Sequence, residues 1–179
     1  IANEIGAVMI LDEITVGFRL TTGGAHLTYG ITPDIAVFAK AMSNGYPMAA
    51  VIGRSEVMES AQNSFISSTS WTDRIGPVAA LATIRKIQRE SVPQYLADVG
   101  NQVKSGWKLA ASNAELPMNV SGIASMPHFE FDHAESGPLR TLFTQLMLDR
   151  GFLATTLFYT TFAHQREHVE RYLTAVNEV

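Results

Sequence analysis

Two short apolar runs, each of which ends in a charged residue, are the most constraining feature of this sequence. Residues 7–11 read Ala-Val-Met-Ile-Leu and lead into Asp12 and Glu13, and residues 35–39 read Ile-Ala-Val-Phe-Ala and lead into Lys40. Short apolar runs with turn residues around them are typical of strands that are covered on both faces in a parallel sheet. The sequence therefore predicts two buried strands, with a carboxylate at the end of the first and a lysine at the end of the second.

A lysine and a carboxylate at strand ends suggest a particular chemistry. A lysine in apolar surroundings can act as a Schiff-base nucleophile, because its amine loses a proton more readily there. A pyridoxal phosphate enzyme needs such a lysine together with a carboxylate that pairs with the pyridinium nitrogen. Lys40 and Asp12 are therefore candidate catalytic residues. From the residues alone, Lys40 could also be a surface lysine that closes a strand, and Asp12 could cap the following turn.

Composition argues against several other classes of protein. The 179 residues carry a formal net charge of −4 and no cysteine, which argues against a basic nucleic-acid-binding surface and excludes disulfides and thiolate metal sites. The histidines show no metal-ligand grouping, so we expect no metal site. No apolar run approaches the ~18 residues of a membrane span, and no signal peptide is visible. We expect a cytoplasmic protein that binds neither nucleic acid nor a membrane.

The chain changes character near Ser91-Val92-Pro93, and we expect two domains, residues 1–91 and 92–179. The first domain reads as an α/β architecture with predicted strands over residues 7–11, 35–39 and 48–53 and a helix from Asp73.

The second domain is predicted to be a small α+β domain. It opens with a long amphipathic helix over residues 94–113, although Gly100 and Gly106 weaken that prediction. The other expected elements are a strand over 126–131, a helix over 136–150, a β-prone segment over 152–162 and a final helix that buries Val169, Tyr172, Leu173 and Val176.

Several motifs, in their order and spacing, resemble the cofactor-lysine half of the class III aminotransferases. They are Ile10-Leu11-Asp12-Glu13-Ile14-Thr15-Val16-Gly17-Phe18-Arg19, Gly23-Gly24-Ala25, Tyr29-Gly30-Ile31-Thr32-Pro33-Asp34, Ala39-Lys40-Ala41 and Asn44-Gly45-Tyr46-Pro47. Each motif is weak alone, but together they are specific, and the resemblance extends over nearly the whole chain. The Phe18-Arg19 and Gly23-Gly24-Ala25 pieces are most similar to the glutamate-1-semialdehyde 2,1-aminomutase branch.

This resemblance implies a fold-type-I pyridoxal phosphate enzyme that forms a homodimer. Its reaction would transfer an amino group between a small-molecule amino donor and a carbonyl acceptor. By resemblance, Lys40 would form the Schiff base with the cofactor, and Asp12 would pair with the pyridine nitrogen. Ile14 would pack against the ring, on the same side of an extended chain as Asp12. Thr69 would contact the phosphate of the cofactor bound in the partner subunit.

The sequence departs from the family pattern in two places. Ser70-Trp71-Thr72-Asp73-Arg74 replaces the usual Ser-Gly-Asn-Pro stretch, and Ser43-Asn44 replaces glycines after the lysine. Both departures lie near where substrate would enter. They therefore put the identity of the substrate in doubt, whereas the expected cofactor chemistry is unaffected. The family's phosphate-binding loop would lie upstream of Ile1. We therefore expect the chain to be the C-terminal half of a longer enzyme, inactive by itself.

Three alternatives stay open at this point. The reaction could be an aminomutation of the glutamate-1-semialdehyde type, in which the amino group moves within one molecule. A pyridoxal phosphate decarboxylase or epimerase on the same fold would share the cofactor residues. A non-catalytic truncated chain is the alternative from a different class.

Overall fold

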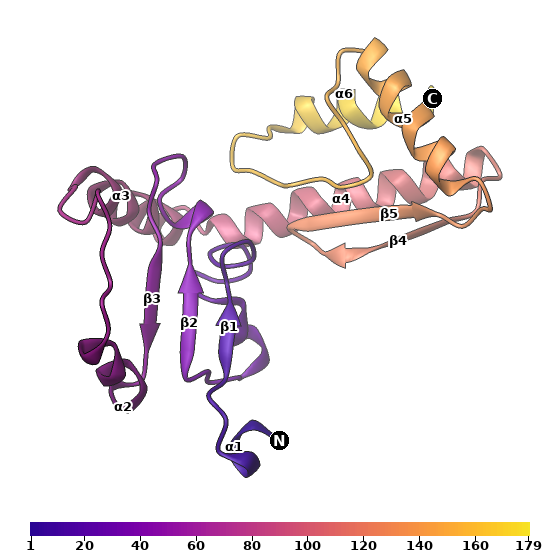
Figure 1. The fold of residues 1–179 in the computed structure, drawn as a ribbon. Coiled ribbons are helices and arrows are strands. Elements are labelled where there is room, and N and C mark those ends of the chain that lie inside the picture. Colours follow the sequence, from indigo (N-terminus) through magenta and orange to yellow (C-terminus); the bar gives the residue numbers. More distant parts are fainter. The chain divides into compact units, whose positions relative to one another are not determined.

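The computed structural model describes residues 1–179, and a three-stranded sheet organises the first part of the chain (Figure 1). The strands are β1 (Ile10–Asp12), β2 (Ile35–Phe38) and β3 (Ala50–Gly53), in the order β1-β2-β3. β1 pairs with β2 in parallel, with Asp12 opposite Val37, and β2 pairs with β3 antiparallel. The connection from β2 to β3 is short, which suits antiparallel neighbours, since parallel strands need a longer crossover.

The strand predicted over residues 35–39 is confirmed as β2, whereas the first strand differs from its prediction. β1 begins at Ile10 instead of residue 7, and the side chain of Ile10 is 57% exposed. The prediction of a strand covered on both faces is therefore wrong for β1. The physical reason is that no other part of this chain covers the face of the sheet to which Ile10 points.

Five short helices precede, connect or follow the strands, and one longer helix comes after them. They are α1 (Ala2–Ile5), η1 (Ala25–Tyr29), η2 (Lys40–Met42), α2 (Ser55–Met58), η3 (Glu59–Asn63) and α3 (Ile75–Arg89). The predicted helix from Asp73 is confirmed as α3, and the Asp73 carboxylate accepts the Ile75 N–H at 2.9 Å. Lys86 and Arg89 lie in the last turn of α3, where the helix dipole favours cations.

The chain divides into two compact units, Ile1–Pro93 and Gln94–Val179. The second unit contains the long helix α4, a hairpin and two further helices (Figure 1). Their bounds are α4 (Val92–Asn113), β4 (Met118–Ile123), β5 (Met126–Phe131), α5 (Ser136–Asp149) and α6 (Arg166–Asn177). β4 and β5 are antiparallel, with Ile123 opposite Met126. None of the helices combines the length and the apolar character that crossing a membrane requires.

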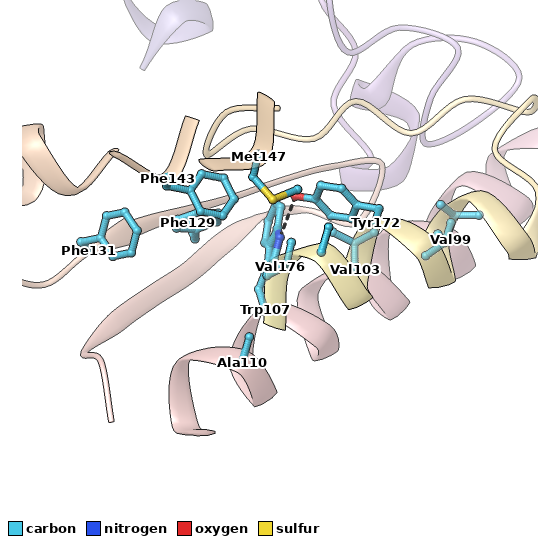
Figure 2. Packing of buried hydrophobic residues seen from close by; sticks show 12 residues of the cluster. Val99, Val103, Trp107, Ala110, Phe129, Phe131, Phe143, Met147, Tyr172 and Val176 are labelled. Carbon is cyan, nitrogen blue, oxygen red and sulfur yellow. Dashed lines mark hydrogen bonds between the residues drawn. The ribbon is translucent and has the colours of Figure 1, made fainter. Parts of the chain in front are cut away.

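The core of the second unit is rich in aromatic residues (Figure 2). The ring of Phe129 on β5 packs edge-on against Trp107 of α4 at 4.8 Å and against Phe143 of α5 at 5.2 Å between centroids. Trp107 Nε1 donates a hydrogen bond to the Tyr172 hydroxyl of α6 at 2.9 Å, drawn as a dashed line in Figure 2. Burial raises the pKa of Tyr172, although this hydrogen bond acts in the opposite direction. One cluster thus joins four elements of the unit.

Two predictions for this unit need correction. The β-prone segment over 152–162 is not a strand, since its pairing is limited to an isolated bridge between Leu157 and His128. The hairpin partner β4 was not predicted, because its residues Met118 to Ile123 include Asn, Ser and Gly, which strands disfavour. The predicted strand over 126–131 and the predicted helices are present.

Candidate functional site

Asp12 and Lys40 lie at the same edge of the three-stranded sheet. Asp12 is the last residue of β1, and Lys40 follows the last residue of β2 by two positions. Because β1 and β2 are parallel neighbours, with Asp12 opposite Val37, their carboxyl ends meet at this edge. This is where open α/β sheets carry their ligand sites. The structure thus brings together the lysine and the carboxylate that the sequence singled out.

The backbone of Lys40 has an unusual conformation. Its φ is +47°, in the left-handed region, directly after Ala39, which is extended with φ −159°. A left-handed residue other than glycine costs roughly 1–2 kcal/mol and is found preferentially at functional sites. The reversal between these two residues ends β2 and starts η2, so it sets the direction in which the lysine side chain leaves the sheet.

The Lys40 amine is exposed but not free. Its Nζ donates a hydrogen bond to Thr15 Oγ1 at 2.8 Å. The Thr15 carbonyl in turn accepts a hydrogen bond from Arg19 Nε at 2.7 Å. Sequence reasoning did not identify Thr15 as a site residue. Its position three residues after Asp12 was visible, but the turn that brings its hydroxyl to the lysine was not.

Asp12 and Ile14 are joined by a turn. Asp12 Oδ1 accepts the Ile14 N–H at 2.9 Å, while Asp12 Oδ2 has no hydrogen-bond partner within the chain. The expectation that the chain stays extended up to Ile14 is wrong, because the turn starts at Ile14 and continues to Arg19. Ile14 is partly buried, and its contact with a cofactor ring stays a prediction.

Glu13 lies next to Asp12 but is part of a buried network. The residue is 2% exposed, and its carboxylate accepts hydrogen bonds from the Ala25 and His26 N–H groups, both at 2.9 Å, and from His26 Nδ1 at 2.8 Å. Burial raises the pKa of Glu13, but the hydrogen bonds from His26 and Ala25 outweigh it and leave the pKa below its ordinary value. Glu13 therefore anchors the start of η1 to the end of β1.

Thr69 is not connected by hydrogen bonds to the residues at this sheet edge. It is exposed in a turn over residues 69–72, and no hydrogen bond joins it to Lys40 or Asp12. Its contact with a phosphate group stays a prediction. No group of three or more His, Asp or Glu side chains is arranged to hold a metal ion.

Comparison with known proteins links this arrangement to one enzyme family. The model of the family "Aminotransferase class-III" matches residues 1–175. The 3-aminobutyryl-CoA aminotransferase of Cloacimonas acidaminovorans (strain Evry) is 33% identical, over 99% of this chain and 44% of that protein. A glutamate-1-semialdehyde 2,1-aminomutase of Clostridium kluyveri is 30% identical, over 99% of this chain and 46% of that protein. The chain spans about half the length of the curated relatives it matches.

Solved structures show the same fold. The FumI protein of Sphingopyxis sp. MTA144, in its PLP internal aldimine form, matches with a TM-score of 0.91 and 24% identity, over 99% of this chain and 43% of that chain. An omega-transaminase from Sphaerobacter thermophilus matches with a TM-score of 0.87 and 22% identity, over 99% of this chain and 44% of that chain.

Proposed function

Because the chain belongs to the class-III aminotransferase family and has the α/β fold of fold-type-I pyridoxal phosphate transaminases, we propose that it carries the covalent attachment site of an aminotransferase. The protein would transfer an amino group between an amine or amino acid and a carbonyl acceptor. The observation that carries this proposal is the shared sheet edge of Lys40 and Asp12, with the lysine amine held at 2.8 Å from the Thr15 hydroxyl.

The residues at this edge suit pyridoxal phosphate. When bound, the cofactor supplies a ring that accepts the electron pair released at the substrate carbon. Lys40 provides a primary amine for attachment to the cofactor aldehyde, and the same amine, once freed by the substrate, moves the proton at that carbon. Asp12 Oδ2 lacks a partner within the chain, so this oxygen is available to hold a proton on the ring nitrogen by charge. Ile14 would pack against the ring face.

Further parts of the proposal concern residues away from the sheet edge. Thr69, whose hydroxyl is exposed, would bind the cofactor phosphate of the partner subunit in a cytoplasmic homodimer. Residues 1–91 would form the cofactor-lysine part of the large domain, and residues 92–179 the small domain. The division of the chain into the compact units Ile1–Pro93 and Gln94–Val179 supports this assignment.

An aminomutase reaction is the second candidate, and two of the relatives favour it. Glutamate-1-semialdehyde 2,1-aminomutases from Clostridium kluyveri and Polynucleobacter necessarius are each 30% identical to this chain. The two reactions differ in their need for a second substrate. An aminotransferase converts more than one equivalent of its amino donor only when a carbonyl acceptor is also supplied, whereas an aminomutase converts a single substrate into its isomer without a second substrate.

The attachment of the cofactor can be tested by chemical trapping. The protein is saturated with pyridoxal phosphate, reduced with borohydride, digested and mapped by mass spectrometry. We expect the pyridoxyl group on Lys40, because this is the lysine beside Asp12, and we expect no adduct in Lys40→Ala. An adduct on Lys86, Lys104 or Lys108 in place of Lys40 would contradict the proposal.

A further inference from the structure

The Lys40 amine has one hydrogen-bond partner in the chain, the hydroxyl of Thr15 at 2.8 Å. An exposed lysine side chain normally samples many rotamers, and fixing it costs up to roughly 2 kcal/mol in side-chain entropy. Lys108, for comparison, is exposed on α4 and makes no hydrogen bond. The bond to Thr15 therefore distinguishes Lys40 from an ordinary surface lysine.

Thr15 is itself held in place by its neighbours. The Arg19 side chain binds the Thr15 carbonyl at 2.7 Å, and the Asp12 carboxylate binds the preceding N–H, that of Ile14, at 2.9 Å. The N–H of Glu13 donates to the Val37 carbonyl of β2 at 2.8 Å. The threonine side chain is also stiff, because branching at Cβ restricts its rotamers. The hydroxyl is thus fixed to the end of the sheet that carries the lysine.

We propose that Thr15 is a positioning residue that holds the Lys40 amine in place for attachment of the cofactor. This inference rests on the proposed role of Lys40. In the attachment step the amine nitrogen bonds to the aldehyde carbon, and the carbonyl oxygen leaves as water with the two amine hydrogens. Thr15 takes no covalent part. While the Lys40 nitrogen carries hydrogens, the Thr15 hydroxyl accepts a hydrogen bond from it. Once the nitrogen has lost its hydrogens, the hydroxyl can donate a hydrogen bond to it.

If the Thr15 hydroxyl only stabilised the turn, it would form hydrogen bonds to other atoms of the turn. The turn from Ile14 to Arg19 is held by main-chain atoms and by the side chains of Asp12 and Arg19, and the Thr15 hydroxyl bonds only to Lys40. Thr15→Val keeps the branched shape and removes this oxygen alone. Thr15→Ser keeps the oxygen.

Two measurements on the full chain test the proposal. The first is the rate at which pyridoxal phosphate attaches to Lys40, followed by absorbance and by borohydride trapping. We expect this attachment to be about 10-fold slower in Thr15→Val than in the wild type. A 10-fold change corresponds to ~1.4 kcal/mol, which is the size of the contribution of one hydrogen bond. Thr15→Ser should lie within about 3-fold of the wild type, since it retains the hydroxyl. The matched control is Thr28→Val, an exposed threonine of η1 without a side-chain hydrogen bond, which should not change the rate.

The second measurement needs no cofactor. Nuclear magnetic relaxation of lysines labelled with ¹³C at Cε reports the mobility of each side chain, with the Lys40 signal assigned by its loss in Lys40→Arg. We expect Lys40 to be more ordered than Lys108 in the wild type and in Thr15→Ser, and equally mobile in Thr15→Val. An unchanged Lys40 signal in Thr15→Val, or a wild-type attachment rate in that variant, overturns the positioning role. An adduct on another lysine would instead refute the proposed function. The relaxation data would then still show whether Thr15 orders the Lys40 side chain.

Discussion

Asp12 and Glu13 are adjacent carboxylates with very different surroundings. The Asp12 side chain is exposed and keeps one oxygen without a partner in the chain, whereas the Glu13 carboxylate is buried and receives three hydrogen bonds. Because strand and turn place the two side chains differently, one remains available to a ligand and the other is committed to the fold. Adjacent acidic residues in a sequence can therefore have separate tasks.

At this scale we expect Glu13→Gln to destabilise the fold by ~1–3 kcal/mol at neutral pH, because an amide replaces a charged acceptor of buried donors. The pKa of Glu13 lies below its ordinary value of 4.5 when the chain is folded. The carboxylate therefore stabilises the fold above pH 4.5, and this contribution is lost as the pH falls through the folded pKa.

Urea unfolding of the wild type and of Glu13→Gln at pH 7 and at acidic pH measures this effect. The difference in unfolding free energy should shrink at acidic pH. Glu59→Gln, which changes an exposed carboxylate on η3, is the control and should have little effect at either pH. A Glu13→Gln difference that stays constant with pH would mean that the charge of Glu13 does not stabilise the fold.

At the scale of elements, α4 contains two glycines, which lower its helix propensity but lie where other elements pack against the helix. A Cβ at Gly100 would lie 1.5 Å from the Ala124 carbonyl oxygen, in the turn between β4 and β5. A Cβ at Gly106 would meet side-chain carbons of Leu173 on α6, the nearest at 2.4 Å. The first neighbour is main chain and the second is the end of a flexible side chain. Gly100 thus permits the close approach of the hairpin to the helix.

We therefore expect Gly100→Ala to be strongly destabilising and Gly106→Ala to be much milder. Alanine gains about 1 kcal/mol in helix propensity at either position. At Gly100 this gain is outweighed, because overpacking typically costs ~1–3 kcal/mol and main-chain displacement costs more. Thermal unfolding of both variants, monitored by circular dichroism, checks the difference. Equal melting temperatures for the two variants would show that the β4–β5 hairpin can move away from α4 without loss of stability.

The elements also show which features the sequence can predict. The helices α4, α5 and α6 repeat apolar residues at helical spacing over several turns, so their periodicity identified them. β4 has six residues with Gly122 among them, and its pairing with β5 depends on a partner that local patterns do not encode. The same distinction applies to the site. Lys40 and Asp12 follow apolar runs and were predicted, whereas Thr15 reaches the lysine only through a turn.

At the scale of the whole molecule, the large apolar core belongs to one unit. Its buried residues, from Val99 to Val176, all lie within Gln94–Val179. In the first unit, large apolar side chains such as Ile10, Ile52 and Phe65 are exposed. The second unit therefore contains most of the buried apolar surface that stabilises a fold.

From this difference we expect residues 92–179, expressed alone, to fold cooperatively. The cut at Val92 keeps α4 intact. Urea unfolding followed by circular dichroism should give a single sigmoidal transition, while residues 1–91 alone should give a broad one. A gradual transition for residues 92–179 would show that the second unit depends on the first for its stability.

The complete burial of Trp107 has an optical consequence. The chain has two tryptophans, Trp107 in the second unit, with no exposed surface, and Trp71 in the first, 68% exposed. A shielded indole fluoresces at shorter wavelengths than a hydrated one, so the emission of the protein has two components, one from each unit. Trp71→Phe leaves a signal from the aromatic core alone, and Trp107→Phe leaves a signal from the turn that carries Thr69. Light emission can therefore follow each unit separately within the intact chain.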